Sequence, residues 1–306
     1  MEGKLVIKIV GVGTGGCHAV DHMYLKGISG VDFVFIDTHP YTFGRSDITE
    51  QICLSTGLTE GPYDPEMGRK AAEESREEIA AALQGADMVI IVAGMGGSIG
   101  AGAAPVVAEI AQSIGSDLTV GVAARPFKFE GEHWLCRAQE GIALFKEKVD
   151  SLVVISNEHL LRTLKPKITL ANAFTASNEV LYQAAQGLCD PITRNCLISF
   201  ADFVSLMKNA GLAHIGVGQA SGENKVEKAA KEAMSSSLLE LPVGGAQRIL
   251  VSFLVPPDVD LKKLDNVASM IFNAAPEDVN FIWVAAIVES PENIVRVTVF
   301  ATDFAD

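Results

Sequence analysis

The chain has 306 residues, of which 48% are hydrophobic, so it is long enough for two domains with sizeable cores. Its formal net charge of −14 would repel phosphate backbones and anionic lipid surfaces. We therefore expect neither nucleic acid nor a membrane surface as a direct partner.

The cysteine pattern and the N-terminus indicate a cellular compartment. The five cysteines stand at irregular spacings without a CxxC pair, which favours reduced thiols and argues against a zinc site. No run approaches 18 uninterrupted apolar residues, and the N-terminus leads into a strand pattern rather than into a signal peptide. These features predict a cytoplasmic protein.

In the first half of the chain, short β-branched runs alternate with helical periods. The runs predict strands at 4–10, 31–37, 86–93, 117–123 and 150–156. Between them, residues 65–83 carry charges on one face and apolar side chains on the other, which predicts a surface helix. Strands that alternate with helices indicate an α/β fold with a parallel sheet wrapped by helices.

The second half has a different organisation. Residues 169–189 are apolar around most of the helical circumference, which predicts a long helix buried between two domains. Beyond it, strands are predicted at 213–221, 247–255, 279–288 and 293–302, with helices at 224–236 and 260–274. We divide the chain into a nucleotide-binding domain at 1–168, a central helix at 169–190 and a smaller α+β domain at 191–306.

The first predicted strand runs directly into a glycine loop with the sequence Gly11-Val-Gly-Thr-Gly-Gly16. This loop fits GxGxxG, and Asp37 ends the second strand where a dinucleotide-binding fold places its ribose-binding acid. Taken alone, the pattern indicates NAD. Its physical content is broader, because glycines let backbone N–H groups approach any phosphate at a helix N-terminus. A tight turn without a ligand is the remaining interpretation.

A second glycine loop argues against the dinucleotide interpretation. The strand at 86–93 is followed by Gly94-Met-Gly-Gly-Ser-Ile-Gly-Ala-Gly102 and a helix. Two such loops at strand ends of one sheet can converge on a single polyphosphate, each contributing backbone donors and a helix dipole. The two loops together predict a nucleotide other than NAD.

The second loop resembles GGGTGTG, the signature of the FtsZ/tubulin superfamily, and the resemblance extends to about residue 303. The stretch at 11–23 resembles the first FtsZ nucleotide loop, 64–74 resembles NPEVGRKAAEE, and 125–131 resembles KPFxFEG. Residues 235–253 resemble the family's SSPLLE…GAKGVLVN segment. The resemblance implies a GTPase domain, a long central helix and a second domain that completes a filament contact.

The resemblance also implies where a guanine nucleotide, GTP or GDP, would bind. Asn157, Phe174, Asn178 and Glu179 would hold the base, with Phe174 as a stacking surface and the carboxylate as an acceptor for the guanine edge. Without the resemblance, Phe174 would be interpreted as a core aromatic, and Asn178 with Glu179 as a solvated helix face. Glu130 would meet the ribose. His18 and Trp134 stand where the family usually has Asn and Arg.

The phosphates would lie on the two glycine loops. The residues implied there are Gly13, Thr14, Gly15, Gly16, Gly94, Gly96, Gly97, Ser98, Ile99 and Gly100. Ser98, Ile99 and Ala101 replace Gly, Thr and Thr of the signature, so two hydroxyls are lost, and a γ-phosphate loop is about three residues shorter between Gly61 and Asp64. Affinity is then expected to depend less on the terminal phosphate, and Mg²⁺ would rely on phosphate oxygens and waters.

The catalytic loop of the family is altered as well. FtsZ carries NVDFADV, which enters the nucleotide site of the next subunit. Here Asp202 is kept, whereas Leu197 and Ser199 replace the Asn and the first Asp. Losing one carboxylate at the attacking water would slow turnover by ~10² or more. A second interpretation is that Ser199 and Asp202 cap a helix, and the two roles are compatible.

The leading hypothesis is therefore a GTP-binding, FtsZ-like filament protein that hydrolyses GTP slowly and assembles head to tail with itself. Whether a paralogous filament protein co-assembles stays open. The FtsZ C-terminal linker and tail are absent from this sequence, which predicts a task other than ordinary division-ring duty, although a truncated chain would look the same. The alternatives are a nucleotide-binding structural filament without hydrolysis and, on the first loop and Asp37 alone, an NAD-dependent oxidoreductase.

Overall fold

The computed structural model describes residues 5–39, 44, 46–55, 64–163, 169–194, 196, 198–236, 243–289 and 292–304. The chain divides into two compact units, Met1–Tyr182 and Gln183–Asp306, and each is described by itself. The boundary falls inside one long helix, α8 (Leu170–Thr193). Within the described residues, no helix combines the length and apolarity needed to cross a membrane.

The first unit is built on a parallel sheet. Its strands are β1 (Ile7–Val12), β2 (Asp32–Asp37), β3 (Glu50–Cys53), β4 (Met88–Gly94), β5 (Leu118–Arg125) and β6 (Ser151–Ser156). Their order is β3-β2-β1-β4-β5-β6, and every paired neighbour is parallel. The central strands are buried almost throughout, as expected for a sheet that is covered on both faces.

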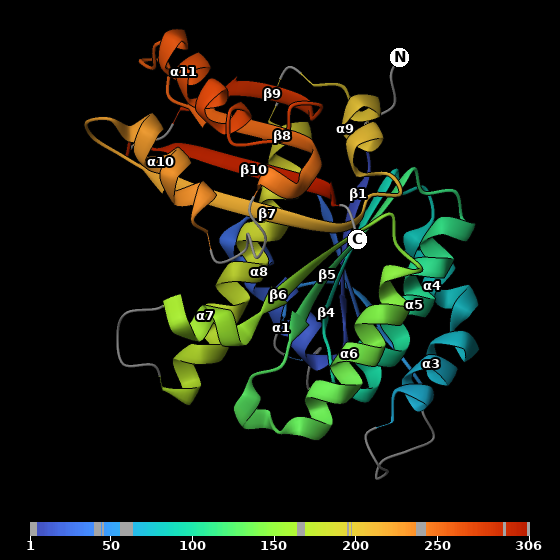
Figure 1. Ribbon diagram of the computed structural model, residues 1–306. Coiled ribbons are helices and arrows are strands. Elements are labelled where there is room, and N and C mark those ends of the chain that lie inside the picture. Colours follow the sequence, from blue (N-terminus) through green and yellow to red (C-terminus); the bar gives the residue numbers. More distant parts are fainter. Residues whose placement is uncertain are drawn as a thin grey trace. The chain divides into compact units, whose positions relative to one another are not determined.

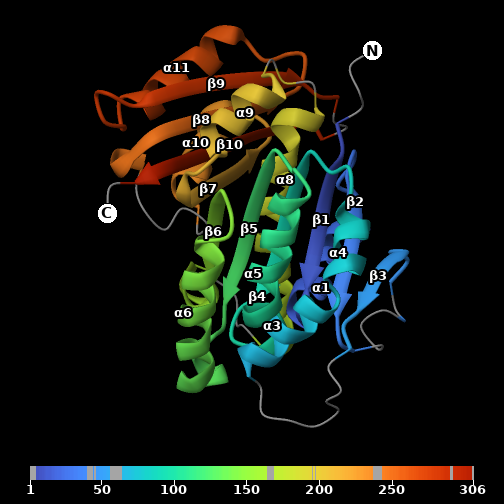
Figure 2. The same ribbon diagram turned by 90° about the vertical axis from the view of Figure 1, so that its right-hand side faces the viewer.

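Helices cover the two faces of this sheet. They are α1 (Gly13–Lys26), α3 (Pro65–Glu74), α4 (Arg76–Leu83), α5 (Ser98–Ser113), α6 (Glu132–Lys146) and α7 (Asn157–Thr163). Figures 1 and 2 show α5 and α6 on one face of the sheet and α1 on the other. This arrangement confirms the predicted parallel sheet wrapped by helices.

The second unit is a smaller α+β structure. Its strands are β7 (Gly211–Ala220), β8 (Ala246–Val255), β9 (Asn280–Ile287) and β10 (Val295–Phe304), in the order β7-β10-β8-β9. β10 is antiparallel to β7 and β8, while β8 and β9 are parallel. The helices α10 (Lys225–Met234) and α11 (Leu261–Phe272) pack their apolar faces against this sheet, and α9 (Phe200–Met207) precedes it in the chain. The predicted α+β class is confirmed.

Two helix predictions need correction. The helix expected over 65–83 is two helices, because Ser75 ends α3 and begins α4 with φ −98° and ψ 14°. The long helix does not stop at 189 but continues to Thr193, through Pro191 in its last turn. The start at Pro65 is as expected: the Asp64 side chain accepts a hydrogen bond from the backbone N–H of Glu66, and proline occupies the first helical position.

Candidate functional site

The order of the strands brings the two glycine loops together. β1 and β4 are parallel neighbours, so their carboxyl ends meet at one edge of the sheet, and each is followed by a glycine loop and a helix. At Gly13, where φ is +70°, a Cβ would lie 3.0 Å from the backbone nitrogen of Gly100. The first loop therefore lies directly against the second.

Two of the predicted glycines are required by this packing. A Cβ on Gly16 would collide with the carbonyl oxygen of Val92 in β4, and one on Gly100 with the carbonyl oxygen of Gly94. Helices α1 and α5 can begin close to the sheet only because these positions lack side chains. Gly16 is buried and is not among the residues that line the cavity described next.

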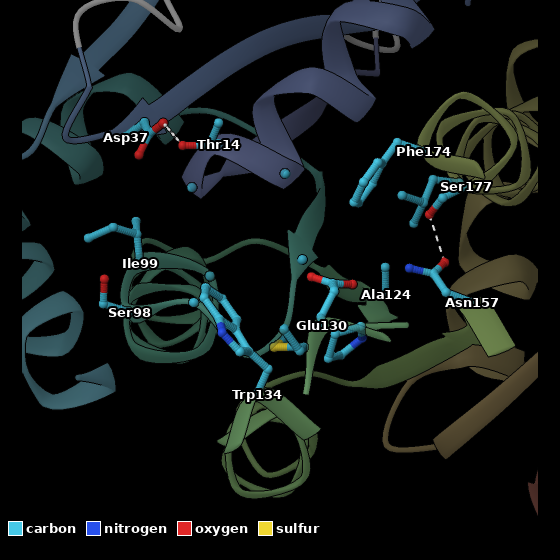
Figure 3. Close-up of a pocket in the computed structure, with 18 of the residues that line it drawn as sticks. Thr14, Asp37, Ser98, Ile99, Ala124, Glu130, Trp134, Asn157, Phe174 and Ser177 are labelled. Carbon is cyan, nitrogen blue, oxygen red and sulfur yellow. Dashed lines mark hydrogen bonds between the residues drawn. The ribbon is translucent and has the colours of Figure 1, made fainter. Parts of the chain in front are cut away.

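A cavity of about 330 Å³ opens where the loops meet (Figure 3). Twelve of the predicted binding residues line it: Gly13, Thr14, Gly15, Gly94, Gly97, Ser98, Ile99, Gly100, Glu130, Asn157, Phe174 and Asn178. The predicted residues Gly16, His18, Gly96 and Glu179 are not among its lining residues. Sequence reasoning gave no role to several further lining residues, including Thr38, His39, Met95, Ala124, Ser177 and Leu181.

One end of the cavity is suited to phosphate. It is formed by the N-termini of α1 and α5, whose first backbone N–H groups have no partner inside their own helix and whose dipoles attract anions. Gly97 is the N-cap of α5, and as a glycine it has no side chain with which to satisfy this helix end. Ser98 and Ile99 lie at this end in Figure 3.

Trp134 packs against the second glycine loop. A Cβ on Gly96, where φ is +107°, would lie 2.9 Å from the carbonyl oxygen of Trp134, and one on Gly97 would lie 3.4 Å from its indole ring. The ring also lines the cavity. Trp134, which was singled out only as a departure from the family pattern, thus supports the loop that faces the cavity.

The opposite end presents an aromatic face and two amides. Phe174 on α8 is 45% exposed and meets Phe127 edge to face, with ring centroids 5.5 Å apart. Ser177 Oγ donates to Asn157 Oδ1 at 2.7 Å, so the Asn157 oxygen already accepts one hydrogen bond, and its NH₂ group is turned toward the cavity (Figure 3). This end offers a stacking surface and a hydrogen-bond donor for a base.

Glu130 lies between the two ends (Figure 3). Its Oε1 accepts a hydrogen bond from the backbone N–H of Phe127 at 2.7 Å. Partial burial raises the pKa of this carboxyl, while the Phe127 hydrogen bond opposes the rise. A carboxylate held in this place can accept hydrogen bonds from sugar hydroxyls.

Glu179 is directed to a different cluster. Its carboxylate lies 2.9 Å from His22 Nε2 and 3.1 Å from Lys26 Nζ, both on α1. Burial pushes the pKa of Glu179 up, but the hydrogen bonds from His22 and Lys26 outweigh it and hold the pKa below its ordinary value. Glu179 therefore contacts α1, whereas its neighbour Asn178 lines the cavity.

The predicted catalytic residues lie in the second unit, at the start of α9. Ser199 is the N-cap: its Oγ accepts from the Asp202 backbone N–H at 3.1 Å and donates to Asp202 Oδ2 at 2.6 Å. Both residues are exposed. The capping interpretation is confirmed, and the carboxylate of Asp202 remains at the surface. Leu197 and Gly61, which also entered the sequence argument, lie outside the described residues.

The cavity fits a magnesium–phosphate complex better than a metal held by protein alone. Among the described residues, no group of three or more His, Cys, Asp or Glu side chains is arranged to hold a metal ion. Mg²⁺ at nucleotide sites is commonly bound by substrate phosphates, waters and one or two carboxylates. Asp37 supplies a carboxylate at the phosphate end.

Comparison with protein families gives matches over both units. Residues 6–165 match the GTPase domain of the tubulin/FtsZ family, and residues 211–305 match the C-terminal domain of the FtsZ family.

Similar solved structures cover nearly the whole chain. An FtsZ dimer from M. jannaschii is 37% identical, with a TM-score of 0.90 over 99% of this chain and 89% of that one. GDP-bound CetZ1 from Haloferax volcanii is 18% identical, with a TM-score of 0.85 over 99% and 95% of the two chains. CetZ2 from the same organism, a GTPγS-bound protofilament, is 18% identical, with a TM-score of 0.81 over 97% and 92%. The CetZ matches establish a common fold.

Proposed function

The chain belongs to the tubulin/FtsZ family, and from this premise we propose that it is a guanine-nucleotide-dependent filament protein that hydrolyses GTP slowly. The observation that carries the proposal is the cavity in which two glycine loops, an exposed aromatic ring and two amides meet. Each group matches one part of a nucleotide. The glycine loops suit the phosphates, the aromatic ring suits the face of the base, and the amides suit its edge. The cytoplasm is the compartment proposed for it.

Guanine is the base that the amide geometry favours. Ser177 occupies the oxygen of Asn157 and leaves its NH₂ group as a donor toward the cavity. A donor matches the carbonyl oxygen on guanine and opposes the amino group that adenine carries at the same ring position. Asn178 contributes an amide from α8 to the same wall.

Self-assembly supplies the rest of the catalytic site in this proposal. The M. jannaschii match is a dimer, and the CetZ2 match is a protofilament. Asp202 is exposed at the start of α9, where it can be presented to a neighbouring subunit's nucleotide. A contact that joins one surface to a different surface does not close on itself, so it propagates head to tail.

Slow hydrolysis follows from the altered residues. Ser199 stands in place of a second carboxylate, and its hydroxyl is bonded to Asp202. The attacking water would then be oriented by one carboxylate, with a loss of roughly 10² or more in rate. Cell division is one role proposed for such a filament. The second candidate function is a structural filament that binds nucleotide without hydrolysing it, and the replacement of the carboxylate by Ser199 favours this candidate as well.

The experiment is a competition for bound, labelled GTP by GTP, ATP and NAD. We expect GTP to compete at least tenfold better than ATP, and NAD not to compete. Phe174→Ala should weaken GTP by about 1 kcal/mol or more, because it removes the stacking face. Phe272→Ala is the matched control: that ring is 43% exposed and meets Phe281 edge to face, but it does not line the cavity. Equal competition by ATP, or equal losses in both variants, would refute the proposed site.

A further inference from the structure

The exposed carboxylate of Asp202 takes its position from the helix that carries it. Among the residues that the structure describes, this carboxylate is bonded to Ser199, the N-cap of the same helix. The helix, α9, has eight residues, and a helix as short as this is marginal by itself in water. The contacts that hold α9 on the sheet of the second unit therefore also determine where Asp202 lies.

One apolar face of α9 packs on this sheet. The helix lies against β8 (Figure 2), and its buried side chains are Phe203, Leu206 and Met207, which stand at helical spacing. Phe203 meets Phe300 of β10 edge to face, with ring centroids 6.0 Å apart. Apolar burial is non-directional, so the direction of so short a helix also depends on the polar contacts at its ends.

Two side chains from the sheet hold the C-terminal end of α9. Arg248 on β8 donates from Nη1 to the carbonyl oxygens of Ser205 and Lys208, at 3.2 and 3.4 Å. Thr302 on β10 donates its hydroxyl to the carbonyl oxygen of Leu206 at 3.3 Å. The last carbonyl groups of a helix have no partner inside the helix, and a cation is favourable beside them. Arg248 and Thr302 are paired across the two strands, so both act on α9 from one place.

The guanidinium of Arg248 joins α9 to β10. Its Nη2 lies 3.2 Å from Asp303 Oδ2, while its Nη1 contacts the helix. Arginine can make both contacts because its donors form a rigid, planar fork, whereas lysine offers a single ammonium group. In the family segment GAKGVLVN, which residues 245–252 resemble, glycine stands at the position of Arg248. The contact with α9 is therefore not implied by the resemblance.

We propose that Arg248 is a positioning residue for hydrolysis: it holds the C-terminal end of α9 on the sheet and thereby fixes where Asp202 is presented to a neighbouring subunit's nucleotide. Thr302 supports the same helix end. The inference rests on the role in hydrolysis that is proposed above for Asp202.

The expected size of the effect follows from the single carboxylate. When one carboxylate orients the attacking water, no second group compensates for its displacement, so a shift of α9 lowers the rate directly. A misplacement of about 1 Å can cost roughly a hundredfold in rate. The apolar face of α9 remains in place without Arg248, so we expect a smaller loss of about tenfold.

The test is GTP hydrolysis by the whole chain in filaments, measured as phosphate release per sedimented subunit over a range of GTP concentrations. Arg248→Ala should lower kcat about tenfold and leave KM within about twofold, because the nucleotide cavity is formed by residues of the first unit. Arg248→Lys keeps a cation but loses the fork, so it should recover part of kcat. An unchanged kcat in Arg248→Ala would overturn the inference.

Two further variants separate positioning from stability and from assembly. Lys225→Ala removes an ion pair with Asp258 in the same unit, and Lys225 has no contact with α9 among the described residues, so kcat should stay unchanged. Thr302→Val keeps the branched side chain but removes the bond to Leu206. Thr302 is 2% exposed and does not reach a neighbouring subunit, so this variant should lower kcat about threefold even if Arg248→Ala no longer assembles. Equal losses in Lys225→Ala and Arg248→Ala, or no loss in Thr302→Val, would overturn the inference.

Asp202→Ala distinguishes this inference from the proposed function. If Asp202→Ala hydrolyses GTP as fast as the unaltered chain, the proposed role of Asp202 fails, and the inference fails with it. If Asp202→Ala is slow while Arg248→Ala and Thr302→Val are as fast as the unaltered chain, only the inference fails.

Discussion

Asn178 and Glu179 are adjacent in the sequence but have different surroundings. Successive residues on a helix point about 100° apart, so one side chain lines the cavity while the other contacts His22 and Lys26 on α1. The family resemblance implies that both residues lie beside the base, because it compares positions in the sequence and not the directions of side chains. Side-chain direction depends on how α8 packs on α1, which a single sequence does not contain.

This difference gives the first prediction. Asn178→Ala should weaken GTP by about 1–3 kcal/mol and ATP by less, because it removes a polar partner of the base edge. Glu179→Gln should change the affinity for either nucleotide by less than about 0.5 kcal/mol, since its carboxylate contacts α1. Equilibrium titration with both nucleotides measures this. A loss of GTP affinity in Glu179→Gln that exceeds the loss in Asn178→Ala would restore the acceptor role that the resemblance implies for Glu179.

Asp37 shows that the position of a residue in the sequence can suggest a role that its contacts do not support. Its position after β2 fits a ribose-binding acid in a dinucleotide fold, and the sequence supports that interpretation until the second glycine loop is considered. In the structure both carboxylate oxygens accept hydrogen bonds, one from Thr14 and one from Thr38. The carboxylate organises the first glycine loop, a role that no motif describes.

Among the elements, the strands and the loop-to-helix junctions follow most directly from the sequence. β-branched runs and glycines specify them through local sterics. The break at Ser75 was missed because both flanking segments, α3 and α4, share one charged, amphipathic pattern. The helix α6 and the strand β3 received no prediction. The buried residues of α6, which are Ala138, Gly141, Ile142 and Phe145, stand at helical spacing and could have indicated it.

The start of α9 carries the second prediction. Ser199→Ala should destabilise the protein by about 1 kcal/mol, because it removes the N-cap, whereas Ser199→Asp should not, since Asp caps equally well. With Leu197→Asn, Ser199→Asp should also raise phosphate release per filament subunit, because it returns a carboxylate beside Asp202. Urea unfolding measures the first effect, and phosphate assays at equal filament mass measure the second.

Two outcomes would count against this account of α9. If Ser199→Ala unfolds at the same urea concentration as the unaltered chain, the hydrogen bond to the Asp202 backbone contributes nothing to stability. If the double change at 197 and 199 assembles normally yet releases phosphate no faster, the slow step lies in the nucleotide cavity, where Ile99 replaces a threonine of the family signature.

A buried histidine in β7 gives the third prediction. His214 is 7% exposed, contacts the ring of Phe304, and its Nε2 has no hydrogen-bond partner. Burial lowers the pKa of His214 from 6.5 to about 4. Between these values the unfolded chain binds a proton that the folded chain does not, so stability falls as the pH drops from about 6.5 to 4, by up to about 3 kcal/mol.

Unfolding in urea at several pH values measures this loss. His214→Met keeps most of the buried volume without a titrating group, so its stability should vary less across the same pH window. Parallel pH curves for the two proteins would show that other groups cause the acid sensitivity.

At the scale of the whole molecule, the two units carry different parts of the proposed chemistry. The cavity belongs to Met1–Tyr182, while Asp202 belongs to Gln183–Asp306. The sequence resemblance predicts this division of roles, which stays a prediction. In a head-to-tail assembly the cavity of one subunit meets Asp202 of another, so the contact has to be tested with mixtures of variants.

The most direct measurement is GTP hydrolysis in a mixture of two variants, each defective in one half of the site. Asp202→Ala keeps the cavity but lacks the catalytic carboxylate, and Phe174→Ala keeps Asp202 but binds nucleotide weakly. In a head-to-tail filament, an intact cavity of the first meets an intact α9 of the second. At a GTP concentration well below the dissociation constant of Phe174→Ala, we predict that each variant alone hydrolyses GTP more slowly than the unaltered chain. The mixture should hydrolyse GTP faster than the sum of the two variants, with filaments visible by electron microscopy. Full activity of Asp202→Ala alone, or a mixture that forms filaments but recovers nothing, would contradict a site shared between neighbouring subunits.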